Sequence, residues 1–132
     1  MTLKIPVKKF IPAIVWFIII IILLTLPASR LPQDQLFQIP QQDKIIHVVL
    51  FFILIYLFSL PFKSSTFSSF ERKLWFIKIT LSGLAFGIIM EFVQENFVLN
   101  RSYEILDIVA DGVGCLFGFI VSLKIFLPYK KK

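Results

Sequence analysis

Apolar residues are gathered into four long runs that are separated by short, more polar connections. The runs cover residues 10–26, 45–62, 74–93 and 105–127. A helix needs about 17 to 25 apolar residues to cross the hydrocarbon core of a bilayer, and each run approaches or exceeds that length. Because a chain inside lipid must satisfy its backbone polar groups within each segment, the runs are predicted to be helices. The pattern therefore predicts four membrane-spanning helices.

Composition favours an integral membrane protein with a single domain. Hydrophobic residues make up 58% of the 132 residues, and the mean hydropathy is +0.87. The four runs take up more than half of the chain, which leaves no room for a separate soluble domain. We therefore predict one transmembrane domain over residues 1–132, an all-α four-helix bundle. The single cysteine, Cys115, excludes an intramolecular disulfide and is expected to be a buried thiol.

The basic residues predict how the helices are oriented. Lysine and arginine gather before the first run, between the second and third runs, and after the fourth run, at Lys4, Lys8, Lys9, Lys63, Arg72, Lys73, Lys130, Lys131 and Lys132. The other two connections hold only Arg30, Lys44 and Arg101. Because cytoplasmic connections carry the excess of Lys and Arg, both termini and the middle connection are predicted to be cytoplasmic. The net charge of +6 is thus a sign of topology and of contact with anionic lipids, and not of nucleic-acid binding.

The first run also has a feature of a secretory signal, since three lysines precede it. The run is long for the apolar region of a signal, and the following sequence, TLPASRLPQ, offers only a weak cleavage pattern. A retained helix is therefore predicted.

The polar residues in and beside the runs gather at one end of the predicted bundle, opposite to the cytoplasmic side. They lie at the start of the second run, the end of the third and the start of the fourth: Asp43, Lys44, His47, Glu91, Gln94, Glu95, Arg101, Glu104, Asp107 and Asp111. A carboxylate near the bilayer core costs at least about 2.5 kcal/mol, so such a group usually has a partner or a function. Asp111 is the most informative of them, because it lies roughly 9 Å along the fourth helix.

Two of these carboxylates lie on the predicted packing face of the fourth helix. At about 100° per residue, Asp107 and Asp111 share a face with a ladder of small residues, Ala110, Gly114, Gly118 and Ser122. Gly83 and Gly87 repeat this spacing in the third run. Small residues let helix backbones approach closely in lipid. The third and fourth helices are therefore predicted to pack together through Gly83, Gly87, Gly114 and Gly118.

Some of the polar residues have structural explanations. Asp107 stands in the first turn of its helix, where the dipole favours an anion, and Asp43 suits a position at or near an N-cap. Glu91 lies toward the C-terminal end of its helix, so Arg101 or His47 is expected to neutralise it. His47 lies one turn after Asp43, and the two are expected to pair.

The same residues could support chemistry. His47, Glu91 and Asp107 are candidates for general acid–base catalysis or for binding a divalent cation. The HExxH, CxxC and P-loop spacings are absent from the sequence, so no metal ligands and no cofactor are assigned. The residues leave open whether the protein is an enzyme, a binding protein or a structural subunit.

Three segments together resemble the VanZ-like family of small bacterial membrane proteins. They are DKIIH, GIIMEFVQ and RSYEILDIVADGVGCLFG, and the resemblance covers about residues 43–118. It implies a multi-pass protein of the bacterial cytoplasmic membrane, and the founding member of the family is associated with teicoplanin resistance. The family motif positions correspond here to Asp43, Lys44, His47, Glu91, Gln94, Arg101, Asp107 and Gly114. Where the family commonly has Asn, this chain has Asp111, whose extra charge could tune a cation or proton site.

The expected function is the recognition or modification of a cell-envelope molecule in an outward-facing polar pocket. Arg101 is expected to contact an anionic group such as phosphate, while the acids orient Arg101 and His47 or hold a cation. The expected partners are the bilayer and a lipid-linked molecule or a glycopeptide, and an oligomer is compatible with the sequence. A metal-assisted membrane enzyme and a structural accessory subunit are the alternatives. The predicted ligand-binding residues are Asp43, Lys44, His47, Glu91, Gln94, Arg101, Asp107 and Asp111.

Overall fold

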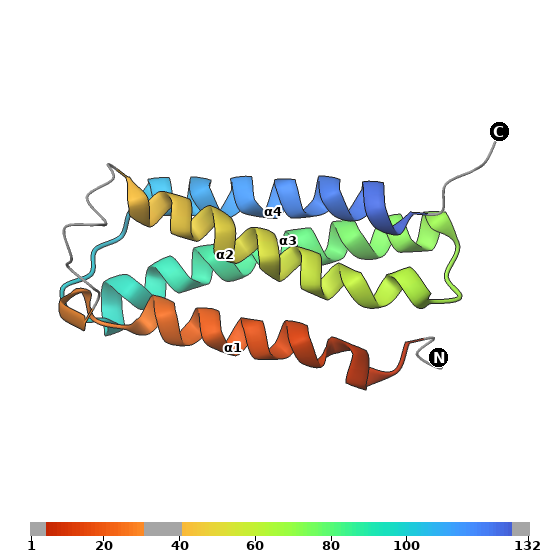
Figure 1. The fold of residues 1–132 in the computed structure, drawn as a ribbon. Helices are drawn as coiled ribbons and strands as arrows, with labels where there is room; N and C mark the ends of the chain where they lie inside the picture. Colours follow the sequence, from red (N-terminus) through yellow and green to blue (C-terminus); the bar gives the residue numbers. More distant parts are fainter. Residues whose placement is uncertain (1–4, 31–40, 128–132) are drawn as a thin grey trace.

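The computed structural model describes residues 5–30 and 41–127, which form four long helices joined by short connections (Figure 1). The helices are α1 (Ile11–Thr25), α2 (Gln42–Ser59), α3 (Ser69–Phe97) and α4 (Ile105–Phe126), with the 3₁₀ helices η1 (Val7–Phe10), η2 (Ala28–Arg30) and η4 (Leu60–Ser64). Neither of the two described ranges contains a β-strand. The predicted all-α class is confirmed.

Each predicted apolar run corresponds to one of the long helices. With their adjoining 3₁₀ turns, the segments Val7–Thr25, Gln42–Ser64, Ser69–Phe97 and Ile105–Phe126 are 19, 23, 29 and 22 residues long. All four are long and apolar enough to cross a membrane.

Helix α3 extends beyond its predicted span of residues 74–93 at both ends. Its start is fixed by a reciprocal cap. The amide of Glu71 donates a hydrogen bond to the Ser68 hydroxyl (3.2 Å), and the amide of Ser68 donates one to the Glu71 carboxylate (2.8 Å). Such a cap satisfies amides that have no partner within the helix, so the helix begins in a polar segment that hydropathy alone does not mark.

Successive helices run in opposite directions, so α2 and α4 run parallel to each other (Figure 1). The N-terminal ends of α2 and α4 therefore lie at the same end of the bundle as the C-terminal end of α3. We call this the polar end. At the opposite end, the start of the described chain, η4 and the end of α4 meet in a buried apolar cluster of Ile5, Phe62, Phe76 and Phe126.

Basic residues tie this opposite end together. The Lys9 ammonium donates a hydrogen bond to the Ser64 hydroxyl (2.6 Å), and the Arg72 guanidinium donates one to the carbonyl oxygen of Phe126 (2.9 Å). Lys9 and Arg72, which are predicted to share one side, thus lie at the same end of the bundle. Four basic residues used in that prediction, Lys4, Lys130, Lys131 and Lys132, lie outside the described residues.

The glycines of α4 are points of close helix approach, but their partner differs from the prediction. A Cβ atom at Gly114 would overlap the backbone carbonyl oxygen of Val48, and one at Gly118 would lie 2.7 Å from Cβ of Ile55. Both neighbours belong to α2, so the prediction that Gly114 and Gly118 pack against the third helix is wrong. A ladder of small residues indicates which face comes close to a neighbour, and it does not indicate which helix that neighbour is.

The glycines of α3 face α4 as predicted, and one of them also faces α2. A Cβ atom at Gly87 would lie 2.7 Å from Oδ2 of Asp111. One at Gly83 would lie 2.6 Å from Cδ1 of Ile55 and 3.1 Å from Sγ of Cys115. Gly83 and Gly87 therefore let α3 lie against the α2–α4 pair.

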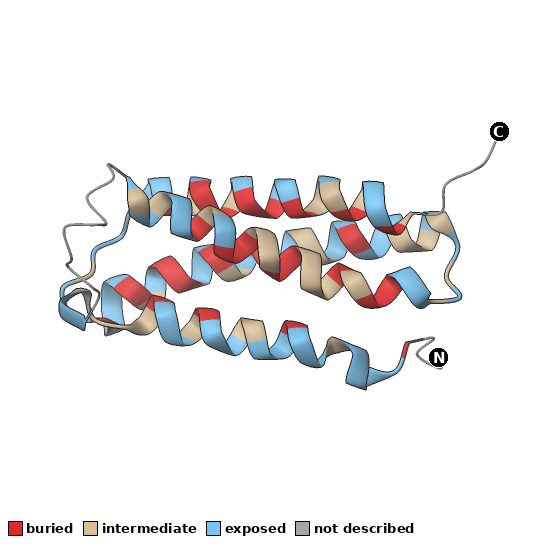
Figure 2. Cartoon of the chain, viewed as in Figure 1, coloured by how far each residue is buried: buried red, intermediate tan, exposed pale blue. Residues whose placement is uncertain are grey.

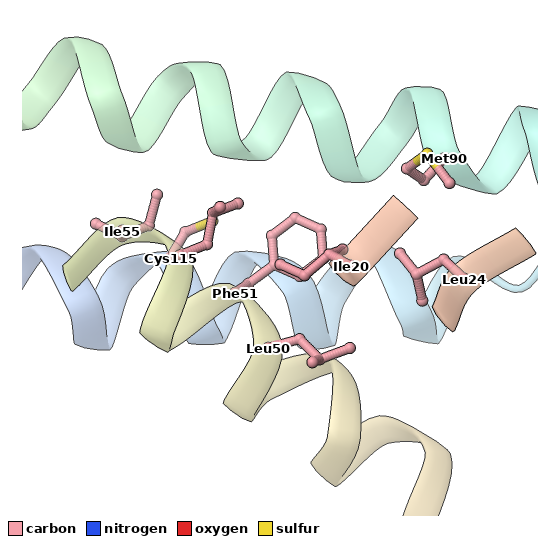
Figure 3. Close-up of a cluster of buried hydrophobic side chains, with 8 residues drawn as sticks. Ile20, Leu24, Leu50, Phe51, Ile55, Met90 and Cys115 are labelled. Atoms are coloured by element: carbon pink, nitrogen blue, oxygen red, sulfur yellow. The ribbon is translucent and has the colours of Figure 1, made fainter. Parts of the chain in front are cut away.

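All four helices contribute to the main apolar core (Figure 3). It consists of Ile20 and Leu24 from α1, Leu50, Phe51, Leu54 and Ile55 from α2, Met90 from α3, and Cys115 from α4. Cys115 is a fully buried free thiol, as predicted. The indole N–H of Trp16 also donates a hydrogen bond to the carbonyl oxygen of Leu50 (3.0 Å), which fixes α1 against α2.

The outer sides of the helices are largely apolar. Figure 2 shows buried residues on the sides that face other helices and exposed residues on the outer sides. Many of the exposed residues are large and hydrophobic, among them Ile18, Ile22, Val49, Leu81, Ile89, Val109, Leu116 and Ile125. A surface of this kind is unusual for a protein that is surrounded by water.

Candidate functional site

A cluster of charged side chains lies at the polar end of these otherwise apolar helices. We call it the polar cluster, and its members are Asp43, Lys44 and His47 of α2, Glu91 of α3, and Glu104, Asp107 and Asp111 at the start of α4. The four innermost members, His47, Glu91, Asp107 and Asp111, are at most 5% exposed. The side chains of Asp43 and Glu104 are about half exposed, so the cluster reaches the molecular surface on their side.

The helix ends contribute to the electrostatics of the cluster. Asp43 and Asp107 stand in the first turns of α2 and α4, as predicted. The partial positive charges of these two N-terminal ends favour the carboxylates that surround them. Asp43 does not act as the cap, because Gln41 occupies the N-cap position of α2 without a side-chain hydrogen bond.

His47 is held between two aspartates of α4. Its Nδ1 atom lies 2.7 Å from Oδ1 of Asp111, and its Nε2 atom lies 3.8 Å from Oδ2 of Asp107. The expected pairing of His47 with Asp43 is wrong, because the buried imidazole points between the helices while Asp43 lies at the exposed edge beside Lys44. The hydrogen bond to Asp111 fixes the plane of the imidazole ring.

Lys44 joins α2 to the start of α4. Its ammonium forms ion pairs with Asp43 and Glu104, and a third with Oδ1 of Asp107 at 2.8 Å. A lysine ammonium has three N–H donors, and two of them are used in hydrogen bonds to Asp43 and Glu104, while Asp107 adds a third negative charge. Lys44 is therefore occupied by the protein itself.

Glu91 is held by the backbone of the α3–α4 connection. Its Oε2 atom accepts a hydrogen bond from the amide of Glu104 (3.1 Å). Its Oε1 atom is buried and has no hydrogen-bond partner among the described residues. The expected ion pair with Arg101 is wrong, since none is formed in the described part of the chain, and a backbone amide takes that place. The other expected partner, His47, does lie near Glu91 in the cluster.

Two predicted ligand-binding residues stand apart from the polar cluster. The Gln94 amide group donates a hydrogen bond to the carbonyl oxygen of Leu24 (2.9 Å), which satisfies a carbonyl in the last turn of α1. Arg101 lies in the connection of residues 98–104, and its buried Nε atom has no hydrogen-bond partner among the described residues.

Three members of the cluster could hold a metal ion. One ligand atom each of His47, Glu91 and Asp107 lie within 4.8 Å of one another, and the three buried residues come from three different helices. A second group, Asp43, Glu104 and Asp107, meets the same distance limit, but two of its members are exposed. Exposed acids commonly gather without a ligand, so the buried group is the more informative one.

Glu104 is the member of the cluster that the sequence did not single out as a ligand-binding residue. It supplies both a carboxylate to Lys44 and a backbone amide to Glu91. Its spacing in the sequence could have indicated this role. Glu104 lies three residues before Asp107, so the two residues fall on the same side of the start of α4. The amide contact has no signal in the sequence.

A cavity of about 300 Å³ lies elsewhere, among α1, α2 and α3. Its lining is mostly apolar and includes Phe17, Phe58, Trp75 and Lys78. Of the residues predicted to be functional, only Gly83 lines it. The cavity is thus separate from the polar cluster.

Comparison with known proteins gives one informative match. An 85-residue stretch, 64% of this chain, is 31% identical to an uncharacterized protein of Schizosaccharomyces pombe. The chain spans about half (49%) of the length of that relative. No family model matches the chain, and no solved structure matches it. The relative is fungal, so this match does not support the bacterial membrane that the VanZ-like resemblance implies. That location stays a prediction.

Proposed function

We propose that this chain is an integral membrane protein that binds the phosphate-bearing head group of a lipid or lipid-linked molecule at its polar end. The polar cluster carries the proposal. Four buried ionisable residues lie within helices whose outer sides are apolar, and ionisable groups inside membrane-spanning helices are costly and usually mark a site.

The apolar exterior supports the location in a membrane. Helix α1 illustrates it, since Ile11, Val15, Ile18 and Ile22 are each at least half exposed. In water these side chains would form a continuous apolar surface, whereas lipid tails would cover them without cost. The basic residues at the opposite end favour an orientation in which that end is cytoplasmic and the polar end faces outward.

Arg101 supports the choice of an anionic ligand. Its guanidinium lies in the α3–α4 connection, at the polar end of the bundle, and forms no ion pair with a described residue, whereas the Lys44 ammonium is paired with three carboxylates. Guanidinium groups bind phosphate through two parallel hydrogen bonds, a geometry that an ammonium cannot offer. Arg101 is therefore the residue that would contact the head group.

The VanZ-like resemblance bears on which molecule carries the phosphate. It favours an envelope molecule of the bacterial cytoplasmic membrane, with teicoplanin resistance as the phenotype. A lipid-linked envelope molecule with a phosphate-bearing head group fits that expectation. The fungal relative is uncharacterized, so the choice of ligand does not rest on it.

Lipid binding by purified protein tests this function. The full-length chain and its variants would be mixed in detergent with short-chain phosphatidic acid, and native mass spectrometry would give the dissociation constant. We expect Arg101→Ala to weaken binding at least about tenfold, which corresponds to about 1.4 kcal/mol. Arg101→Lys should bind with intermediate affinity, because lysine keeps the charge and loses the planar pair of donors.

The matched control is Arg30→Ala, which removes an exposed arginine from η2 and should leave the affinity unchanged. Phosphatidylcholine is the control lipid, since its phosphate is a diester with a single negative charge that the choline cation balances. Equal affinities of the wild-type and Arg101→Ala proteins for phosphatidic acid would contradict the proposal.

A metal-assisted membrane enzyme is the second candidate function. The meeting of His47, Glu91 and Asp107 favours it, because these residues combine metal ligands with groups suited to acid–base work.

A further inference from the structure

Glu91 carries a buried carboxylate oxygen that lacks a hydrogen-bond partner within residues 5–30 and 41–127. The residue is 1% exposed, and its Oε1 atom has no hydrogen-bond partner in the described part of the chain. The other oxygen, Oε2, is fixed by the amide of Glu104, so the carboxylate cannot turn freely to find a partner. A buried, oriented and unpartnered acceptor is unfavourable unless something binds it.

His47 presents a ring nitrogen to the same place. Asp111 binds Nδ1 at 2.7 Å, and this contact leaves Nε2 as the nitrogen that faces Asp107. A carboxylate bound to one imidazole nitrogen is the common arrangement behind histidines that ligate metals through the other nitrogen. Asp111 is thus placed as a positioning residue.

The two carboxylate oxygens of Asp107 face different side chains of α2. Oδ1 forms the ion pair with Lys44, while Oδ2 lies 3.8 Å from Nε2 of His47. Two ligands that are each about 2.1 Å from a tetrahedrally coordinated zinc ion lie about 3.4 Å apart, so a small shift of either side chain would suffice. Oδ1 and Lys44 would hold the carboxylate in place during that shift.

The charge of the cluster also favours a cation. It contains five carboxylates and one lysine, which leaves an excess of four negative charges before His47 is counted. The N-terminal ends of α2 and α4 offset part of this excess. A divalent cation among the innermost carboxylates would offset a further part where it is least exposed to water.

We propose that Nε2 of His47, Oε1 of Glu91 and an oxygen of Asp107 form a site for a divalent transition-metal ion such as Zn²⁺. One imidazole and two carboxylates suit zinc, whereas calcium and magnesium prefer ligand sets made of oxygen alone. Three protein ligands leave a fourth position for water or a phosphate oxygen. The inference deepens the proposed function. Only the binding of a phosphate oxygen at the fourth position rests on that function, since a bound zinc ion would bring a phosphate head group to an otherwise acidic cluster.

Zinc titration of the full-length protein tests the site. The protein would be purified in detergent without added phospholipid, freed of its affinity tag and stripped with a chelator, and ZnCl₂ binding would be followed by calorimetry. We expect one zinc ion per chain for the wild-type protein. Glu91→Gln and Asp107→Asn should each weaken binding at least 100-fold, because each removes a charged ligand. Asp111→Asn should weaken it about 10- to 100-fold, as is typical for a residue that orients a ligand.

Glu95→Gln is the matched control, since it makes the same change one turn along α3 at an exposed position, and it should bind zinc as the wild type does. Helix content from circular dichroism identifies any variant that fails to fold, and the inference is then decided by the remaining variants. A folded wild-type protein that binds no zinc, or equal zinc binding by all the variants, would overturn the site.

The zinc and lipid experiments can fail separately. Binding of phosphatidic acid by a protein that binds no zinc would overturn the metal site and leave the proposed function. Zinc binding that depends on Glu91, in a protein that binds no phosphatidic acid, would establish the site and contradict the head-group function.

Discussion

At the scale of single residues, Asp111 has two neighbours that restrict it in different ways. Its Oδ1 atom binds the buried imidazole of His47, and its Oδ2 atom lies against the backbone of Gly87, where a Cβ atom would be only 2.7 Å away. Gly87 therefore makes room for the carboxylate, and the carboxylate satisfies the histidine. The close approach of α3 and the orientation of His47 depend on the same side chain.

Two substitutions of Asp111 should distinguish the contribution of its hydrogen bond with His47 to stability from the contribution of its charge. Asp111→Ala leaves Nδ1 of His47 buried without a partner, which costs about 1 to 3 kcal/mol of stability. Asp111→Asn keeps an oxygen that can accept from Nδ1–H and fits beside Gly87, so it should be clearly more stable than the alanine variant. Unfolding of the purified, metal-free proteins in detergent would measure the difference.

Glu95→Ala serves as the control for that comparison, because it removes an exposed carboxylate. Equal stabilities of Asp111→Ala and Asp111→Asn would show that the hydrogen bond to His47 contributes nothing to stability.

The position of Asp111 was predictable from the sequence, whereas its partner was not. The helical period places Asp107 and Asp111 on the face with the small residues, and both are buried there. The partner of His47 was expected four residues away at Asp43, because spacing within a helix can be read from the sequence. Contacts between helices depend on how far one helix is shifted along another, and a single sequence does not contain that shift.

At the scale of elements, the parallel pair of α2 and α4 positions the site. Gly114 and Gly118 bring the two backbones together, with Val48 and Ile55 as their neighbours on α2. This approach places the first turns of both helices side by side, and the polar cluster forms there. The sequence predicted the helices and their close-approach faces, but it assigned the glycines of α4 to α3.

Alanine substitution in α4 tests this close approach. Gly114→Ala would place a methyl group on the carbonyl oxygen of Val48, which belongs to the backbone and cannot turn away. Overpacking of this kind costs about 1 to 3 kcal/mol. Gly112→Ala is the matched control, because its new methyl group would meet only Cδ2 of Leu84 at 3.4 Å, an ordinary contact distance.

Unfolding in detergent, followed by circular dichroism, would compare the two variants. We expect Gly114→Ala to be less stable than the wild type and Gly112→Ala to be at least as stable, since alanine favours a helix more than glycine does. Gly114→Ala with the stability of the control would mean that α2 and α4 do not approach as closely as described.

At the scale of the whole molecule, the basic residues Lys9 and Arg72 and the mainly acidic polar cluster lie at opposite ends of the bundle. The basic contacts of Lys9 and Arg72 lie where α1 begins and α4 ends, while the polar cluster lies where α2 and α4 begin. The excess of basic residues favours the cytoplasmic side, so the cluster should face the other side of the membrane. Hydropathy and the placement of polar residues were sufficient to predict the four helices and the polar end, because both act on whole segments and do not depend on detailed contacts. The orientation in a membrane stays a prediction.

Cysteine labelling in intact cells tests the orientation. Cys115 is fully buried, so the wild-type chain provides an unreactive background for single new cysteines. Ser102→Cys introduces a thiol at an exposed position in the connection before α4, and Thr66→Cys introduces one at an exposed position in the connection after α2. A maleimide that cannot cross membranes should label Ser102→Cys in intact cells and Thr66→Cys only after the cells are permeabilised. The reverse pattern would place the polar cluster on the cytoplasmic side, and the proposed phosphate-bearing ligand would then have to be sought inside the cell.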